Sequence, residues 1–239
     1  MAGNLPTSML GQTGVEVTRL GFGAMELRDS SIKWPIEDTD AELLLNRVLD
    51  QGITFIDTAD CYGRSEDFIG RFISGRRSEF TLATKCGCIP GGRDWTADNL
   101  KRGVERSLTR LQTDYVDVVQ LHGATPDDLN QEESLEALIR MRDEGKVRWI
   151  GASTSTPHIE TYTEWGSFDV FQIPYSAFSQ ENETQITDAS KAGMGTIIRG
   201  GVAKGQPGEG KGTPDRWALW EKAGLGDLCQ EGETPTTFM

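Results

Sequence analysis

Four polar residues have the types and spacing of a proton-transfer site. Asp57, Lys85 and His122 end three successive β-type runs of the sequence, and Tyr62 follows Asp57 in the next connection. Parallel strands of a barrel end at one face, so these side chains are expected to meet there. A lysine beside a phenol favours the phenolate and lowers the tyrosine pKa, and a carboxylate can hold that lysine in place. The pattern predicts that Tyr62 is a general acid.

His122 extends this prediction to the substrate. An imidazole N–H beside Tyr62 can donate to a carbonyl oxygen and stabilise the alkoxide that forms as a hydride reaches carbon. Taken singly, each residue has a simpler explanation: Asp57 could cap a helix, and Tyr62 could be a half-buried loop aromatic. Lys85 could be a solvated strand end, and His122 a turn histidine. Their joint placement favours the catalytic interpretation.

The elements that must position these residues alternate along the chain. Seven β-type runs are predicted, at 19–22, 54–57, 80–85, 115–122, 147–152, 170–173 and 195–198, and most are followed by an amphipathic helical run. This alternation is typical of parallel βα units. No Gly-rich dinucleotide motif follows the first run, so the expected fold class is α/β, a (β/α)8 TIM barrel rather than a doubly wound sheet.

Two further patterns refine this fold. Residues 8–20 predict an N-terminal β-hairpin, because glycine at both ends of the turn 11–14 can adopt positive φ. Two helices are expected to cover the sheet through apolar faces. Their predicted faces are Leu43, Leu44, Val48 and Leu49 in the helix that begins near Asp38, and Leu100, Val104, Leu108 and Leu111 in the helix over 97–111.

The C-terminal part of the sequence does not complete the repeat. A Gly-rich, charged stretch over 200–215 is followed by an apolar helix around 217–225, and the sequence stops at Met239 without an eighth β-type run. We therefore expect a single barrel domain over 1–239 that is truncated before the eighth βα unit. Such a barrel would have two unpaired edges.

Composition excludes several classes of function. A formal charge of -13 and a pI near 4.6 do not suit nucleic-acid binding, which needs clustered Lys and Arg. No signal-like start is present and no apolar stretch approaches the roughly 20 residues of a membrane helix, so a cytoplasmic protein is expected. The sequence gives no expectation of oligomeric state.

The cysteines do not suggest a metal site in sequence. Cys61, Cys86, Cys88 and Cys229 lack paired C-x-x-C spacing and a matching group of histidines. Reduced thiols are the expectation for a cytoplasmic protein, and no bound metal is predicted.

Several motifs together resemble those of the aldo-keto reductases. They are 20–23 (LGFG), 55–63 (FIDTADCYG) with Ser65-Glu66, 83–85 (ATK), and 114–117 (DYVD) leading to Leu121-His122, and the resemblance covers about residues 9–204. In that family the matching Asp, Tyr, Lys and His form a catalytic tetrad. The resemblance therefore implies an NADP-dependent enzyme that reduces an aldehyde or ketone, for example a sugar-type carbonyl, with Asp57, Tyr62, Lys85 and His122 as its tetrad.

The resemblance also implies cofactor contacts. Residues 151–154 (GAST) resemble the family's Gly-x-Ser-Asn motif, with Thr154 in place of Asn, and Gln172 resembles the glutamine that binds the nicotinamide amide. Helix capping before Pro157 is the alternative for Ser153 and Thr154. Arg199 stands where the family has an aromatic residue, and its guanidinium could stack or pair with phosphate. The full implied set is Gly23, Met25, Asp57, Ser153, Thr154, Gln172, Arg199 and Lys204.

The remaining expectations concern substrate and class. Trp34 and Trp95 follow the first and third β-type runs, where the family builds its pocket, so they are expected to contact substrate together with His122. NADP is expected from the resemblance, and NAD stays open because no adenosine-binding segment matches. Three other classes remain: a regulatory nicotinamide-binding module, an inactive fragment, and an aldolase with a Schiff base on Lys85.

Overall fold

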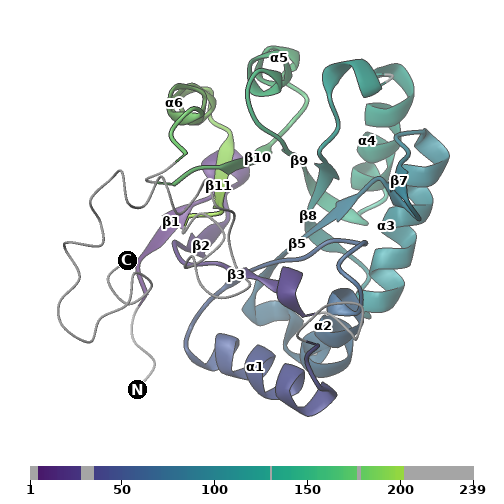
Figure 1. Cartoon of the computed structure of the whole chain (residues 1–239), viewed down its shortest axis with the longest axis vertical. Helices are drawn as coiled ribbons and strands as arrows, with labels where there is room; N and C mark the ends of the chain where they lie inside the picture. Colours follow the sequence, from purple (N-terminus) through teal and green to yellow (C-terminus); the bar gives the residue numbers. More distant parts are fainter. Residues whose placement is uncertain (1–4, 28–34, 130, 177–178, 202–239) are drawn as a thin grey trace, which may run out of the picture.

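A curved, parallel seven-stranded sheet forms the centre of the computed structural model, which describes residues 5–27, 35–129, 131–176 and 179–201. The strand order is β3-β4-β5-β8-β9-β10-β11, so successive strands pair in the order of the sequence. This arrangement confirms the predicted α/β barrel class (Figure 1). The strands are β3 (Phe22–Gly23), β4 (Phe55–Asp57), β5 (Thr81–Cys86), β8 (Val116–His122), β9 (Val147–Ser153), β10 (Val170–Pro174) and β11 (Gly195–Arg199).

Two antiparallel strand pairs of the described residues stand outside this sheet. Strands β1 (Thr7–Met9) and β2 (Glu16–Thr18) form the predicted N-terminal hairpin, and β6 (Cys88–Ile89) pairs with β7 (Gly92–Arg93) after β5. The first barrel strand begins later than predicted, because the Arg19 N–H donates to the Pro6 carbonyl at 2.8 Å and so extends the hairpin. Strand β3 therefore starts at Phe22 rather than at residue 19.

In the part of the chain that the structure describes, six α-helices lie around the outer side of the sheet (Figure 1). They are α1 (Asp38–Asp50), α2 (Ser65–Ile73), α3 (Ala97–Leu111), α4 (Glu136–Asp143), α5 (His158–Trp165) and α6 (Glu183–Lys191). Shorter turns are η1 (Gly11–Thr13), η2 (Ala24–Glu26), η3 (Ser74–Glu79), η4 (Pro126–Asp128) and the π-type η5 (Gln131–Leu135). Among the described residues, each helix is too short or too polar to cross a bilayer.

The predicted buried face of α1 was wrong in part. Leu43 is 69% exposed and Leu44 is 38% exposed. The face that packs inward consists of Ala41, Leu45, Val48 and Leu49. The small residue Ala41 begins this face at helical spacing. Because the prediction counted only large apolar residues, it placed the buried face too far around the helix. In α3 the prediction is confirmed, because Leu100, Val104 and Leu111 are buried and Leu108 packs against the core.

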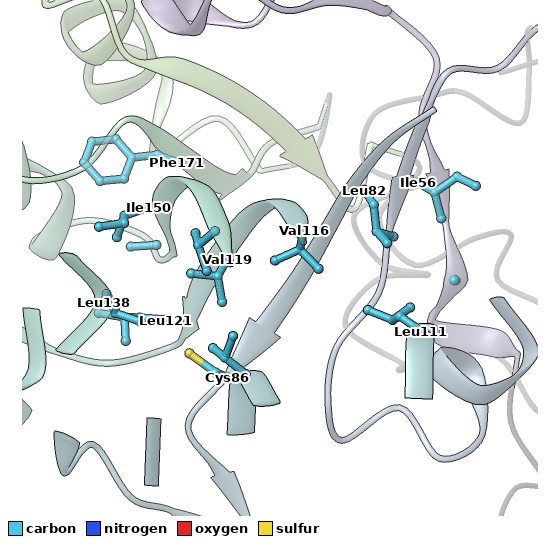
Figure 2. Packing of buried hydrophobic residues seen from close by; sticks show 14 of the residues in the cluster. Ile56, Leu82, Cys86, Leu111, Val116, Val119, Leu121, Leu138, Ile150 and Phe171 are labelled. Carbon is cyan, nitrogen blue, oxygen red and sulfur yellow. The ribbon is translucent and has the colours of Figure 1, made fainter. Parts of the chain in front are cut away.

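The main core fills the space between the strands and the helices. Figure 2 shows side chains of neighbouring strands beside those of α3 and α4, with Ile56, Leu82, Val119, Leu121 and Ile150 from the sheet and Leu111 and Leu138 from the helices. All seven have relative exposures of 1% or less. Burial of each such side chain contributes about 1.5 to 3 kcal/mol relative to leaving it in water.

A second apolar cluster fills the inner side of the sheet. Its strand members are Phe55, Ala83, Val118 and Val170, with Trp149 and Ile197 packed against them. These residues alternate in sequence with those of the outer core, as side chains on opposite faces of a strand must. Leu10 and Val17 of the hairpin belong to the same cluster. The hairpin therefore closes the end of the barrel from which the strands start.

Backbone contact fixes the hairpin to the last described strand. The Gln12 N–H donates to the Gly193 carbonyl at 2.8 Å. At Gly11, φ is +56°, and an added Cβ would lie 2.3 Å from the Gly195 nitrogen. The turn predicted from its two glycines thus needs Gly11 both for its conformation and for close approach of two backbones.

Asp117 joins neighbouring strands on the helix side of the sheet. Its carboxylate accepts hydrogen bonds from the Leu82 N–H at 2.8 Å, from Arg77 at 2.6 Å and from Arg148 at 2.8 Å. The Asp117 side chain is only 4% exposed. Because a buried carboxylate is costly without such partners, this residue and its arginines depend on one another.

We expect Asp117→Ala to lower the free energy of unfolding by about 3 kcal/mol, because it leaves the mostly buried Arg77 without its carboxylate. Urea unfolding followed by circular dichroism measures this change. Asp188→Ala is the control, since Asp188 pairs with Lys191 at 3.5 Å on an exposed surface, where ion pairs contribute little. Equal midpoints for the two variants would contradict the role given to Asp117.

Candidate active site

A polar layer lies above the inner apolar cluster, towards the ends of the strands. Asp57, Lys85, Gln120, Gln172 and Arg199 each follow an inward apolar residue of the same strand by two positions. Side chains two residues apart point to the same face of a strand. The side of the sheet that carries the inner apolar cluster therefore turns polar at the carboxyl ends of β4, β5, β8, β10 and β11.

An ion pair between Lys85 and Asp57 occupies the middle of this layer. Lys85 Nζ donates to Asp57 Oδ2 at 2.6 Å and to the Thr58 carbonyl at 2.8 Å. Lys85 is 1% exposed, and the Asp57 side chain is 14% exposed. These contacts exclude the simpler explanations of both residues, because Lys85 is not a solvated strand end and Asp57 does not cap a helix.

Gln120 completes the coordination of Asp57 and was missed by the sequence analysis. Its Nε2 donates to Asp57 Oδ1 at 3.0 Å, so this hydrogen bond joins β8 to β4 past the intervening strand β5. Room for this side chain comes from Gly151, where an added Cβ would lie 3.1 Å from Gln120 Cγ and 2.8 Å from the Val170 carbonyl oxygen. The inward position of Gln120, two residues before His122, was the signal that could have identified it.

Tyr62 lies against this ion pair at the start of the connection after β4. The Lys85 ammonium is 5.0 Å from the centroid of the Tyr62 ring. Burial raises the pKa of Tyr62, and this effect exceeds the opposing influence of Lys85. The expected net lowering of the Tyr62 pKa was therefore wrong in this structure, although Lys85 acts in the expected direction. A phenol with a raised pKa keeps its proton at neutral pH and can donate it.

His122 faces Tyr62 from the end of β8. The two rings meet edge to face, with centroids 5.7 Å apart. The structure thus brings Asp57, Tyr62, Lys85 and His122 together, as the sequence predicted. On its other side the His122 ring contacts two cysteines, with Nδ1 lying 3.4 Å from the sulfur of Cys61 and 3.4 Å from that of Cys88.

The two cysteines affect one another. A hydrogen bond with Cys88, and the nearby His122, hold the pKa of Cys61 well below its usual range, whereas contact with Cys61 and burial raise the pKa of Cys88. Cys61 is exposed and Cys88 is buried. Sequence spacing gave no sign of this pairing, because the two residues follow different strands.

The expected cofactor residues divide into a close pair and more scattered positions. Ser153 Oγ donates to Gln172 Oε1 at 3.2 Å, and both side chains are buried. Helix α5 begins at His158 without a side-chain cap, so Ser153 and Thr154 do not cap it. The amide nitrogen of Gln172 has no hydrogen bond to another described side chain or backbone group, which leaves two N–H donors for a ligand.

Other expected ligand contacts vary in their surroundings. Gly23 and Met25 are exposed at the end of β3, and Arg199 is exposed at the end of β11. Trp95 is half-buried and packs against the main core, and an added Cβ at Gly87 would lie 2.0 Å from its ring. Trp95 therefore has a packing role, and its contact with substrate stays a prediction. Trp34 and Lys204, like the predicted helix around 217–225, lie outside the described residues.

A buried carboxylate beneath the site also escaped prediction. Glu66 of α2 is 1% exposed and accepts a hydrogen bond from Thr84 at 2.7 Å, and Arg110 pairs with it at 3.4 Å. Burial raises the pKa of Glu66, opposed by the Thr84 hydroxyl and by Arg110. Since Thr84 precedes Lys85 in β5, this contact ties the outer side of that strand to α2.

Comparison with known proteins identifies the family. A model of the aldo/keto reductase family matches residues 19–215. The chain is 34% identical over 205 residues to an uncharacterized oxidoreductase, YqkF, of Bacillus subtilis, with 82% of this chain and 64% of the relative covered. It is 36% identical over 160 residues to L-galactose dehydrogenase of Arabidopsis thaliana, with coverages of 64% and 50%.

Solved structures agree with this match. The holo form of an aldo-keto reductase from Bacillus halodurans superposes with a TM-score of 0.82 at 31% identity, covering 98% of this chain and 80% of that one. The protein therefore belongs to the aldo/keto reductase family. It spans 64% and 50% of the lengths of the two curated relatives above.

The opposing charges around Tyr62 lead to a test of the site. Lys85 lowers the Tyr62 pKa and Asp57 raises it. At one fixed alkaline pH, Lys85→Met should therefore decrease the tyrosinate absorbance of Tyr62 and Asp57→Asn should increase it. The Tyr62 signal is obtained by subtracting the spectrum of the same variant that also carries Tyr62→Phe, and circular dichroism at that pH controls for unfolding. Identical signals in both folded variants would show that neither charge acts on the phenol.

Proposed function

We propose that this protein is an NAD(P)H-dependent oxidoreductase that reduces an aldehyde or ketone to an alcohol. The observation that carries the proposal is the convergence of Tyr62, His122 and the buried Lys85–Asp57 ion pair at the carboxyl ends of the barrel strands. Membership of the aldo/keto reductase family supports the same reaction class. A small carbonyl compound, for example of sugar type, is the proposed substrate.

Tyr62 acts as the general acid in this proposal. Burial keeps its phenol protonated until the substrate oxygen becomes negative. The Lys85 ammonium, 5.0 Å from the ring centroid, then stabilises the phenolate that remains after the proton has moved. Asp57 and Gln120 keep Lys85 at this position and do not themselves exchange a proton.

His122 positions the carbonyl. Its ring meets Tyr62 edge to face, so an imidazole N–H and the phenol O–H can donate to one oxygen. Two donors at that oxygen stabilise the alkoxide more than the neutral carbonyl, which is the condition for catalysis. The half-buried His122 stays within reach of a ligand that enters from the carboxyl face.

The residues fit a nicotinamide cofactor. A bound nicotinamide supplies the hydride. The free amide donors of Gln172, fixed by Ser153, suit the carboxamide of the nicotinamide, with Thr154 beside them. Arg199 at the end of β11 offers an exposed cation to a phosphate. Gly23 ends β3 at the opposite edge of the sheet, and Met25 follows it in η2. We propose NADPH as the preferred cofactor on the family resemblance, with NADH as the alternative.

Among the competing functions, the Schiff-base aldolase has the least support. Lys85 is held in an ion pair at 2.6 Å, so it contributes charge rather than a free amine. A relative from Escherichia coli is named an NADH-specific methylglyoxal reductase, at 28% identity, which supports both a carbonyl substrate and a comparison of the two cofactors. A regulatory nicotinamide-binding module would bind cofactor without turnover.

Fluorescence titration with NADPH and NADH, followed by turnover of a panel of aldehydes and ketones, tests the proposal. Tyr62→Phe should reduce turnover by about 10²- to 10⁴-fold, because it removes the general acid, while cofactor affinity stays the same. Tyr115→Phe is the matched control, since Tyr115 stacks with Arg77 and Arg148 at the other end of the barrel. Failure to bind either cofactor would overturn the proposal, and binding without any turnover would favour the regulatory module.

Gln172→Ala should weaken NADPH binding about 10-fold, which is the loss expected for one good hydrogen bond. The exposed Gln51 at the end of α1 provides the control substitution Gln51→Ala. The dissociation constants come from the same fluorescence titration. Equal affinities for the two variants would remove Gln172 from the proposed cofactor site.

A further inference from the structure

Four side chains beside the proposed active site combine the atoms that bind transition metals. A carboxylate oxygen of Asp60, the sulfurs of Cys61 and Cys88 and a ring nitrogen of His122 all lie within 4.8 Å of one another. We propose that these four residues form a binding site for a divalent transition-metal ion, with Zn²⁺ as the preferred metal.

The spacing of the ligand atoms suits a tetrahedral ion. Bonds of about 2.0 to 2.3 Å to nitrogen, oxygen and sulfur place neighbouring ligand atoms roughly 3.4 to 3.8 Å apart around zinc. Nδ1 of His122 is already 3.4 Å from the sulfur of Cys61 and 3.4 Å from that of Cys88. The remaining separations reach at most 4.8 Å, so they shorten by up to about 1.4 Å when the ion binds. Cys61 is exposed and can supply this movement.

A carboxylate oxygen of Asp60 that is unpaired among the described residues is independent evidence that this cluster binds a cation. Its side chain is fully buried, and Oδ2 pairs with Arg106 at 3.1 Å. Its other oxygen, Oδ1, accepts no hydrogen bond from any described residue. A buried carboxylate oxygen without a partner is costly, and a metal ion bound there would remove that cost.

The backbone around the cluster is well supported. The Asp60 N–H donates to the Lys85 carbonyl at 3.1 Å, and Arg110 donates to the Asp60 carbonyl at 2.9 Å. Arg93 Nε donates to the His122 carbonyl at 3.1 Å. Such outer contacts hold metal ligands in place and strengthen binding.

The ligand types select the metal. Thiolate and imidazole ligands favour Zn²⁺ over Mg²⁺ and Ca²⁺, which prefer oxygen. Binding requires both sulfurs as thiolates, and their protons pass to the solvent. The two thiolates and the carboxylate then carry three negative charges, which the ion and the adjacent Arg106 offset.

His122 links this metal site to the proposed reaction. A metal bound at Nδ1 leaves Nε2 as the nitrogen that carries the ring proton. The metal would therefore fix the tautomer that can donate to a substrate oxygen. This consequence rests on the proposed function, whereas metal binding itself is independent of it and can be measured without substrate.

Cobalt titration of the chelator-treated, chemically reduced protein tests the site. One Co²⁺ per chain should give a thiolate-to-metal charge-transfer band and the intense visible bands of a tetrahedral complex, and Zn²⁺ should displace it. Cys61→Ser and Cys88→Ser should each reduce the charge-transfer band and weaken Zn²⁺ affinity by more than about 100-fold, beyond the effect of losing an outer contact. Cys86→Ala is the control, because Cys86 belongs to the main core. No thiolate band, or an unchanged band in Cys61→Ser, would overturn the proposal.

The histidines allow a second, independent measurement. The chain has only two, His122 and His158. Zn²⁺ should shift the ¹⁵N signals of the His122 ring in a two-bond ¹H–¹⁵N spectrum and leave His158, which lies in α5, unchanged. His122→Gln assigns the signals. Equal shifts of both rings, or none, would contradict metal binding at this cluster and would leave the proposed reductase function unaffected.

Discussion

The rest of the proposed site depends on the burial of one charge, the Lys85 ammonium. An ammonium with 1% exposure is stable inside the barrel only if fixed anionic or carbonyl groups replace its water. Asp57 and the Thr58 carbonyl provide these groups, and Gln120 holds Asp57. The lack of a side chain at Gly151 is in turn what admits Gln120. Tyr62 can serve as a proton donor in the proposed reaction because this charge lies beneath its ring and stabilises the phenolate.

The same two-residue period gives the fold its core and the site its polar layer. Along β8, Val119 and Leu121 face the helices, whereas Val118 and Gln120 face the interior. Because this alternation is visible in the sequence itself, the sequence predicted all seven barrel strands and the meeting of Asp57, Tyr62, Lys85 and His122. The alternation of residues within one strand is therefore enough to predict that strand and the side chains it points inward.

Features that depend on contacts between distant segments could not be predicted in this way. The face of α1 depends on which residues the sheet accommodates, so the small Ala41 lies inward and the larger Leu43 outward. The Tyr62 pKa reflects how deeply the loop is buried, a quantity that residue types do not give. The contacts among Cys61, Cys88 and His122 join a residue after β4, a residue in β6 and the last residue of β8, so no spacing such as C-x-x-C in the sequence indicates them.

The docking of the hairpin on the last described strand has a consequence for the order of folding. During synthesis the hairpin is made before β8 and β10, yet Leu10 and Val17 are buried against residues of these two strands, and the Gln12 N–H donates to the Gly193 carbonyl. The apolar side chains of the hairpin are therefore buried only after these later segments have been made. Contacts so distant in sequence form slowly, and apolar side chains that stay exposed until then favour aggregation.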